Sequence, residues 1–285
     1  MITGKTKLLG VIGDPVEHSL SPVMHNAAIA YLNLDYIYLP FPIKQENLPK
    51  AIAGFQAIGL LGFSVTIPHK QAIIPLLSQV SPTAKMVGAV NTVVWTQEGW
   101  HGTNTDVAGF IAPLKTLNRD WTKITPVILG NGGAARAVVV GCAELGCPEI
   151  RVVGRNKEKL DHFKQSWADS PLHGAVTVHS VDELPGLVSA TELLVNTTPV
   201  GMYPHEEKTP MEVGVIEKIQ QGAIAYDLIY NPRPTQWLKQ AEKQGAIVID
   251  GLEMLVQQGA AALELWLQQQ VPVDIMRQAL LKQFE

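Results

Sequence analysis

Short apolar runs alternate with segments of helical spacing along most of the chain, and this alternation is typical of an α/β protein. Ser21 is expected to be the N-cap of the first helix, because serine oxygens accept bonds from free N–H groups and proline suits the next position. The pattern up to Leu117 predicts the strands Leu8–Ile12, Tyr36–Ile43 and Gly62–Thr66, a hairpin in residues 89–104 turning at Gln97-Glu98-Gly99, and the helices Pro22–Leu32, Glu46–Ile58, His69–Leu77, Pro82–Val87 and Val107–Leu117.

The most informative segment is PVILGNGGAARAVVVGCAELG, Pro126 to Gly146, which predicts a strand, a glycine turn and a helix. It matches the dinucleotide fingerprint G-x-G-x-x-G/A, with Gly130 and Gly132 at the first two positions and Ala135 at the third. The helix start would offer free N–H groups and a positive dipole end to a pyrophosphate. Taken alone, the same motif also fits a glycine-rich turn in any α/β protein.

The next predicted strand, Glu149–Arg155, ends in a basic residue. An NAD site places Asp or Glu here to bind the ribose 2′-hydroxyl. Arg155 is instead suited to a 2′-phosphate, and Lys157 and Lys159 follow it. The alternative is a solvated basic helix start, although basic residues there oppose the helix dipole. The sequence therefore predicts NADP(H) as the cofactor.

The remaining pattern completes a two-domain organisation. It predicts the strands Val127–Leu129, Val176–His179, Leu193–Asn196, Ile224–Leu228 and Ile247–Ile249 and the closing helices Leu252–Gln269 and Val273–Phe284. We expect an N-terminal α/β substrate domain (residues 1–106), a doubly wound Rossmann NADP-binding domain (107–251) and a C-terminal helical return (252–285) that completes the first domain. Ligands are expected in a cleft between the two domains.

Composition excludes several classes of function. A net charge of −4 over 285 residues gives no basic field for nucleic acid. Cys142 and Cys147 are the only cysteines, and their spacing is not expected to place them on one face. With no signal-peptide pattern in the first fifteen residues and no apolar run of membrane length, a cytoplasmic protein is expected. The eight histidines lack paired-ligand spacing, so no metal site is predicted.

Polar residues at the predicted strand ends of the first domain are candidates for substrate chemistry. Ser19 and Ser21 lie two residues apart before a helix, although Ser21 could serve only as a cap. Lys70 follows the strand that ends at Thr66 and would be either solvated or a cleft-facing amine. Asn91 and Asp106 lie at the start and exit of the hairpin, where turn chemistry alone could explain them.

These motifs occur together in the order found in shikimate dehydrogenases. HSLSP, SVTIPHK, GAVNT, GTNTD, GNGGAA, VGRN, NTTPVGM, YDLIY and DGLEMLVQQ extend from the first loop to Gln258. The chain resembles that family over nearly its whole length. The resemblance implies NADP-linked reduction of 3-dehydroshikimate to shikimate in aromatic amino-acid biosynthesis.

The resemblance also implies a role for individual residues. Lys70 and Asp106 would form the catalytic pair, and Asp106 would also hold substrate. Further substrate contacts would come from Ser19, Ser21, Thr66, Asn91, Tyr230 and Gln258. The cofactor would be bound by Gly130, Asn131, Gly132, Gly133, Ala134, Arg155, Asn156, Lys159, Thr197 (within Asn196-Thr197-Thr198), Leu228 through its backbone, and Gly251.

The sequence departs from the commoner family pattern at four positions. Ser64 replaces a frequent Asn, Asn131 a frequent Ala, Glu253 a frequent Gly, and Asn156 a usual Thr. Ser64 would shorten one hydrogen bond to the substrate, which bears on substrate stringency.

Two rival functions remain at this stage. One is a quinate or quinate/shikimate dehydrogenase, whose NAD-preferring form would carry Asp in place of Arg155. The other is a non-catalytic ligand-sensing member of the fold, which would have no need of Lys70 or Asp106. The expected partner is a small-molecule substrate, with neither nucleic acid nor membrane, and a homodimer is the candidate assembly.

Overall fold

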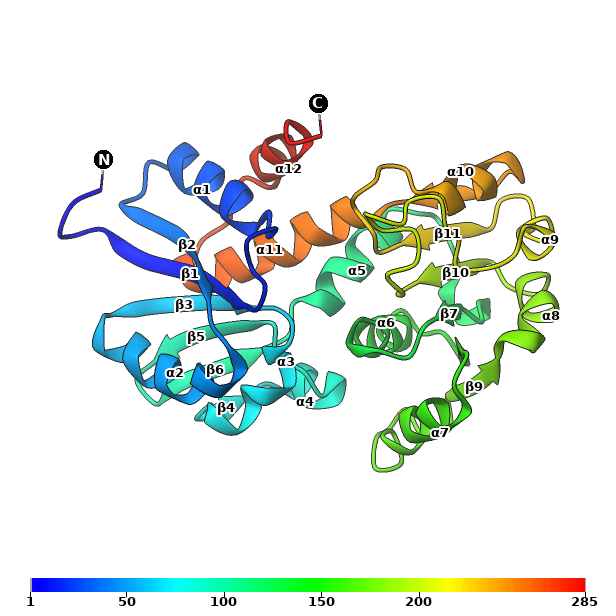
Figure 1. Cartoon of the computed structure of the whole chain (residues 1–285), viewed down its shortest axis with the longest axis horizontal. Helices are drawn as coiled ribbons and strands as arrows, with labels where there is room; N and C mark the ends of the chain where they lie inside the picture. The colour runs from blue at the N-terminus through cyan, green and yellow to red at the C-terminus, as the bar shows by residue number, and fades with distance from the viewer. Residues whose placement is uncertain (1, 285) are drawn as a thin grey trace. The chain divides into compact units, whose positions relative to one another are not determined.

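The computed structural model describes residues 2–284, and its contacts divide the chain into two compact units (Figure 1). Unit 1 comprises Met1–Gly109 and Val256–Glu285, and unit 2 comprises Phe110–Leu255. Helices α5 (Asp106–Lys115) and α11 (Gly251–Leu267) carry the chain from one unit to the other. The domain boundaries expected from the sequence lie in the first turns of these two helices.

Unit 1 is built on a mixed six-stranded sheet with the strand order β2-β1-β3-β5-β6-β4. Strand β1 pairs in parallel with β2 and β3, whereas β5 pairs antiparallel with both β3 and β6. Its strands are β1 (Lys7–Gly13), β2 (Tyr36–Pro42), β3 (Leu60–Val65), β4 (Gln79–Val80), β5 (Thr92–Thr96) and β6 (Gly99–Thr103). Its helices and 3-10 turns are α1 (Ser21–Tyr31), η1 (Gln45–Asn47), α2 (Leu48–Ala57), α3 (His69–Ala72), η2 (Ile74–Leu76), α4 (Pro82–Val87) and α12 (Val273–Leu281).

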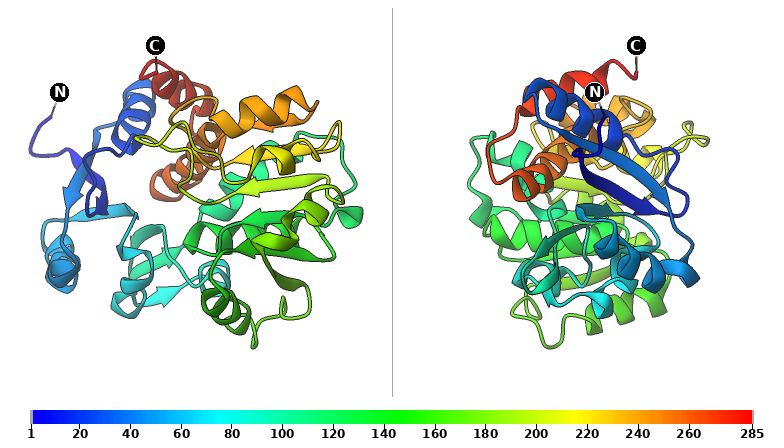
Figure 2. Two further views of the ribbon diagram at one scale, coloured as in Figure 1. Left: turned by 45° about the vertical axis from the view of Figure 1, so that its right-hand side comes forward. Right: turned by 90° about the vertical axis from the view of Figure 1, so that its left-hand side faces the viewer.

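Each face of this sheet is covered by helices. Helix α2 buries Leu48, Ile52 and Phe55 in a core shared with strand residues such as Phe63. On the other face, Tyr38 of β2 stacks on His25 of α1, with ring centroids 4.2 Å apart. Helices α1 and α12, far apart in sequence, pack side by side, as the blue and red helices in Figure 2 show.

Unit 2 is built on a six-stranded sheet with the order β12-β11-β10-β7-β8-β9, in which every neighbouring pair is parallel. This order is that of a doubly wound Rossmann sheet. The strands are β7 (Val127–Leu129), β8 (Ile150–Gly154), β9 (Val176–Ser180), β10 (Leu193–Asn196), β11 (Ile224–Asp227) and β12 (Ile247–Ile249). The helices and 3-10 turns are η3 (Trp121–Lys123), α6 (Gly133–Glu144), α7 (Lys157–Gln165), η4 (Val181–Glu183), α8 (Leu184–Val188), α9 (Val213–Ile216) and α10 (Gln236–Lys243).

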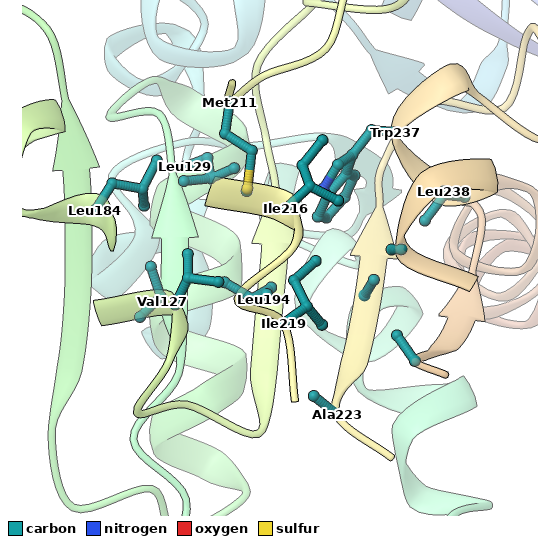
Figure 3. Close-up of a cluster of buried hydrophobic side chains, with 14 of the residues drawn as sticks. Val127, Leu129, Leu184, Leu194, Met211, Ile216, Ile219, Ala223, Trp237 and Leu238 are labelled. Atoms are coloured by element: carbon teal, nitrogen blue, oxygen red, sulfur yellow. The ribbon is translucent and has the colours of Figure 1, made fainter. Parts of the chain in front are cut away.

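Helices cover both faces of the parallel sheet. On one face, side chains of α8, α9 and α10 pack with strand residues in a continuous apolar cluster that includes Trp237, Ile216 and Leu194 (Figure 3). On the other face, Phe110 of α5 stacks on Tyr226 of β11 with centroids 5.2 Å apart. Strands buried on both faces are mostly apolar, and for this reason β7 and the first residues of β10 and β11 are recognisable in the sequence as short apolar runs. The predicted α/β fold class is confirmed.

The predicted cap of the first helix is wrong. Helix α1 already includes Ser21, and its N-cap is Leu20, which makes no side-chain cap bond. The Ser21 backbone N–H instead donates to the Ser19 hydroxyl, 3.3 Å away. Proline at position 22 suits the first turn, and the chain therefore enters the helix one residue earlier than expected.

Two predicted helices are partly replaced by 3-10 turns. The helix expected over His69–Leu77 ends at Ala72 and continues as the 3-10 turn η2, because Pro75 has no N–H to donate within an α-helix. The helix expected over Glu46–Ile58 begins with the 3-10 turn η1 and becomes α-helical only at Leu48, with Pro49 in its first turn. The two-residue strand β4 was not predicted, since two residues carry no periodicity.

The expectation that the two cysteines do not share a face is also wrong. Cys142 lies in the last turn of α6, and the backbone N–H of Cys147 donates to its carbonyl at 3.0 Å. The chain turns back after the helix, and the two thiols come close enough for each to shift the pKa of the other. Both cysteines are free and buried. Burial raises the pKa of Cys142, whereas the neighbouring Cys142 thiol lowers that of Cys147.

Among residues 2–284, no helix is long and apolar enough to cross a membrane.

Gly62 of β3 is a position where α11 approaches the sheet closely. A Cβ there would lie 2.2 Å from Trp266 Nε1 and 2.8 Å from the Val93 carbonyl, which are themselves hydrogen-bonded at 2.9 Å. We predict that Gly62→Ala destabilises the chain by about 1–3 kcal/mol, because a well-packed contact must open. Thermal and urea unfolding followed by tryptophan fluorescence measure this loss.

The matched control is Gly54→Ala in α2, where a Cβ would meet nothing within 4 Å. Alanine is favoured over glycine in a helix, so this variant should gain about 0.5–1 kcal/mol. Equal stability of the two variants would contradict the close approach at Gly62.

Candidate active site

Lys70 is positioned by the turn that follows β3. The His69 N–H donates to the Thr66 carbonyl at 2.9 Å, and the buried His69 ring lies 2.6 Å from the Ile43 carbonyl through Nε2. The Lys70 carbonyl accepts from the Val90 N–H at 2.8 Å. Because the backbone is fixed on both sides, only the Lys70 side chain is left to move.

The Lys70 ammonium contacts the Asp106 carboxylate, with Nζ to Oδ2 at 2.6 Å. Their side chains are 29% and 14% exposed, so the pair is partly shielded from solvent. Asp106 is the first residue of α5, and its N–H donates to Asn104 Oδ1 at 2.9 Å. The structure thus brings together the two residues predicted as the catalytic pair.

Asn91 is the buried centre of this site, with only 3% of its surface exposed. Its amide nitrogen donates to Asp106 Oδ1 at 2.8 Å and lies 3.4 Å from Gln258 Oε1. Its oxygen accepts from the Thr105 N–H at 2.7 Å and from the Thr92 hydroxyl at 2.9 Å. Both ends of the amide are therefore committed, which fixes the Asp106 carboxylate.

Three further predicted substrate residues surround the first loop of unit 1. The Ser19 hydroxyl accepts from the Ser21 backbone N–H at 3.3 Å, and Ser21 itself is buried. Thr66 follows β3, where its N–H donates to the Ile12 carbonyl at 2.9 Å. The Thr66 methyl group lies against Gly13, whose Cβ would meet it at 2.5 Å. Ser19 thus lies in the loop after β1, Ser21 begins α1, and Thr66 directly follows β3.

The glycine loop of unit 2 has the shape that a dinucleotide needs. Gly130 has φ +101°, and a Cβ there would lie 2.8 Å from Thr197 Oγ1. Gly132 and Gly133 would meet nothing within 4 Å, and both are exposed together with Ala134. Helix α6 begins here without a side-chain cap, so its first N–H groups are available to an anion. These residues fit a bound pyrophosphate.

The residues that follow β8 include two exposed basic side chains and one helix cap. Arg155 and Lys159 are exposed, as a 2′-phosphate site requires. The Asn156 side chain instead caps α7, accepting from the Lys159 N–H at 2.8 Å. Asn156 therefore orders the helix start, and its predicted contact with the cofactor stays a prediction.

The YDLIY segment meets the start of α11 in a close backbone contact. A Cβ on Gly251 would lie 2.1 Å from the Leu228 carbonyl, and the Gly251 N–H donates to the Ile229 carbonyl at 3.0 Å. The Thr197 hydroxyl donates to the Leu129 carbonyl at 2.7 Å. Tyr230 is half-buried, and burial raises its pKa. Its predicted contact with substrate stays a prediction.

Beneath this segment lies a buried carboxylate that the motif analysis did not single out. Asp227 is fully buried, and its Oδ1 accepts from Asn196 Nδ2 at 3.0 Å and from the Ile229 N–H at 3.1 Å. Its Oδ2 accepts from the Thr235 hydroxyl at 2.7 Å. Asp227 thereby ties the ends of β10 and β11 to the loop before α10.

Three other residues of the site were also missed. Thr105 and Asn104 complete the hydrogen-bond network around Asn91 and Asp106, and Tyr38 donates to Ser64. Asn104 and Thr105 belong to the GTNTD motif. The signal that could have identified them is that both are polar and directly precede Asp106 in this motif. No pattern in the sequence marks Tyr38, because a tyrosine in a strand fits packing alone.

Within residues 2–284, no group of three or more His, Cys, Asp or Glu side chains is placed to hold a metal ion.

Comparison with known proteins identifies relatives over the full length. Family profiles match the shikimate dehydrogenase substrate binding domain at residues 11–93 and the shikimate 5'-dehydrogenase C-terminal domain at residues 251–281. A shikimate dehydrogenase (NADP(+)) of Gloeothece citriformis is 66% identical over 280 residues, covering 98% of this chain and 97% of its own.

Solved structures of shikimate dehydrogenases have the same fold as this chain. A shikimate dehydrogenase in complex with NADP+ has a TM-score of 0.91 and 37% identity, covering 100% of this chain and 98% of its own. A shikimate 5-dehydrogenase of Listeria monocytogenes, in complex with shikimate and NAD, has a TM-score of 0.90 and 35% identity, covering 98% of both chains.

The parallel sheet with its open glycine loop, joined to a second α/β unit, defines a two-unit oxidoreductase that uses a nicotinamide dinucleotide. Sequence identity to shikimate dehydrogenases over the whole chain then identifies the family within this class. The chain belongs to the shikimate dehydrogenase family, and NADP(H) is its cofactor, as the sequence predicted.

The buried carboxylate of unit 2 predicts a pH-dependent stability. Burial raises the pKa of Asp227 from 3.8 to about 6, and the negative charge of Asp250 acts in the same direction. The folded state therefore holds a proton that the unfolded chain has released between pH 4 and 6. The contribution of Asp227 to the unfolding free energy is greatest below pH 4 and is lost as the pH rises through 6.

We predict that the unfolding free energy of the wild type, minus that of Asp227→Asn, falls by up to about 3 kcal/mol between pH 4 and 7. Urea denaturation at several pH values measures it. Asp161→Asn, at an exposed carboxylate of the same unit, controls for the loss of one charge. A difference that is constant over this range contradicts the protonation of Asp227.

Proposed function

We propose that this chain interconverts 3-dehydroshikimate and shikimate with NADP(H), and that Lys70 and Asp106 move the proton. The observation that carries the proposal is the 2.6 Å contact between Lys70 Nζ and Asp106, held in place by Asn91. A non-catalytic ligand-sensing protein would have no need of such a pair, because binding alone requires no proton donor.

The chemistry requires a proton at one oxygen of the substrate. When bound, NADPH supplies the hydride that reduces the ketone carbon. The ketone oxygen then gains negative charge and must be protonated as it forms. The Lys70 ammonium stabilises that charge and donates the proton, while Asp106 orients the ammonium and balances its charge. In the oxidative direction the same pair accepts the proton.

The hydroxyl and amide groups around this pair would bind the remaining oxygens of the substrate. Asn91 donates to Asp106 and lies 3.4 Å from Gln258. Ser19 lies in the loop after β1, Ser21 begins α1, and Thr66 follows β3. A substrate rich in hydroxyls and carrying a carboxylate suits such a set, because each oxygen needs a directed partner.

The cofactor would be bound by residues of unit 2. The α6 N-terminus with Gly130, Gly132 and Gly133 would hold the pyrophosphate. Arg155 would bind the 2′-phosphate, with Lys159 adding a weaker contribution. The two buried free thiols favour a reducing, cytosolic setting for the enzyme.

Removal of the Lys70 amine tests the chemical step. Lys70→Ala should lower kcat for shikimate oxidation by about 10²–10⁴-fold, the usual loss for a missing acid–base group. Asp106→Asn should cause a related loss, because an amide would present N–H groups to either Lys70 or Asn91. The losses in the double variant should be far from additive, since the two residues act as a unit.

Steady-state kinetics with NADP+ and shikimate measure these effects. Lys85→Ala, at an exposed lysine of α4, is the matched control and should leave kcat unchanged. NADPH binding, measured by fluorescence, should stay near normal in every variant. A Lys70→Ala enzyme with native kcat contradicts the assigned role.

Substitution of Arg155 tests the choice of cofactor. Arg155→Ala should raise the KM for NADP+ by roughly 10–100-fold and leave that for NAD+ almost unchanged, because charge-assisted bonds to the 2′-phosphate are lost. Arg155→Asp should shift the preference further toward NAD+. Raised salt should weaken the preference for NADP+ in the wild type.

Arg151→Ala provides the control, since Arg151 lies on the same strand but is paired with Glu149 at 3.0 Å. Its cofactor preference should match that of the wild type. If Arg155→Ala leaves the ratio of the two cofactors untouched, Arg155 is a surface residue without a role in selection.

A further inference from the structure

Tyr38 is a buried polar group that the chemistry above does not use. It lies on β2, and its phenol donates to the Ser64 hydroxyl of β3 at 2.8 Å. Strand β1 lies between β2 and β3, so the side chain spans the width of a strand to make this bond. Tyr38 is fully buried, and without this partner its hydroxyl would be costly to bury.

The ring of Tyr38 is held rigidly. His25 stacks on it at 4.2 Å, and the Trp266 ring lies 5.8 Å away. Burial lowers the pKa of His25 to about 3, so His25 packs as a neutral ring at neutral pH. The Tyr38 backbone exchanges two bonds with the Asn26 side chain, at 2.8 and 2.9 Å. A rigid ring fixes the position of the phenol oxygen.

Hydrogen-bond counting then leaves one proton on Ser64. A phenol has one proton, and Tyr38 gives it to Ser64. The Ser64 hydroxyl accepts this bond and keeps its own proton for another acceptor. The two hydroxyls therefore form an ordered pair that ends in a donor at Ser64.

Ser64 borders the candidate active site. It pairs across the sheet with Thr92, whose hydroxyl donates to Asn91. The next residue of β3, Val65, donates its N–H to the Asn91 carbonyl at 2.7 Å. Ser64 is only partly buried, so its remaining proton is available to a bound molecule.

We propose that Tyr38 is a positioning residue, which orients the Ser64 hydroxyl so that it donates to an oxygen of the bound substrate. The proposal rests on the proposed function of the site. A serine hydroxyl rotates freely, so a partner such as Tyr38 is needed to fix the direction of its proton.

The test is a thermodynamic cycle on Tyr38 and Ser64. Tyr38→Phe keeps the ring and removes the phenol oxygen, and it should raise the KM for shikimate about 3–10-fold while kcat changes less than about twofold. The KM for NADP+ should not change. Ser64→Ala should raise the KM for shikimate by a similar factor, and adding Tyr38→Phe to it should cause no further rise. Calorimetric binding of shikimate should show the same pattern.

Tyr36→Phe is the matched control, because it removes a hydroxyl from the same strand at a residue outside the site. It should leave every constant unchanged. An unchanged shikimate KM in either Ser64→Ala or a folded Tyr38→Phe overturns the proposal. The proposal is also overturned if Tyr38→Phe raises the KM for shikimate by the same factor in the wild type and in Ser64→Ala. Failure of the wild type to oxidise shikimate would refute the proposed function instead.

Discussion

The Asp106 carboxylate, held between Asn91 and Lys70, is the interaction on which the site depends. A carboxylate in free solution would sample many orientations, and a lysine side chain even more. Here one carboxylate oxygen accepts from Asn91 at 2.8 Å and the other from Lys70 at 2.6 Å. Asn91 is itself fixed by Thr92 and Thr105. The fold alone therefore sets the orientation of the pair, which is what the proton transfer proposed for Lys70 and Asp106 would require.

Buried hydrogen bonds also fix the loops of unit 2, where the surface proposed to bind the cofactor is mostly backbone. Gly130 adopts a positive φ that other residues rarely take, and Gly251 lets the Leu228 carbonyl approach α11. The backbone of these loops is held in position by hydrogen bonds to a buried side chain. Asp227 is fully buried and accepts bonds from Asn196 and from the Ile229 N–H. As a consequence, burial raises the pKa of the Asp227 carboxyl to about 6.

Much of this architecture could be predicted because it follows local rules. The apolar runs of β7, β10 and β12 identified strands to the residue, and the glycine spacing identified the dinucleotide unit. The predictions of a helix cap and of cysteine placement failed, because both depend on the residue at which the chain changes direction. The cap of α1 shifted by one residue, and the thiols of Cys142 and Cys147 met because the chain folds back after α6. Tyr38 was missed because its partner Ser64 lies on a non-adjacent strand.

A crystal structure with NADP+ and shikimate bound tests the central claim most directly. The account predicts that Lys70 Nζ and a carboxylate oxygen of Asp106 both lie within hydrogen-bond distance, about 2.6–3.2 Å, of the hydroxyl on the carbon that is oxidised. A complex in which that hydroxyl contacts neither residue, with Lys70 and Asp106 still paired elsewhere, would contradict it.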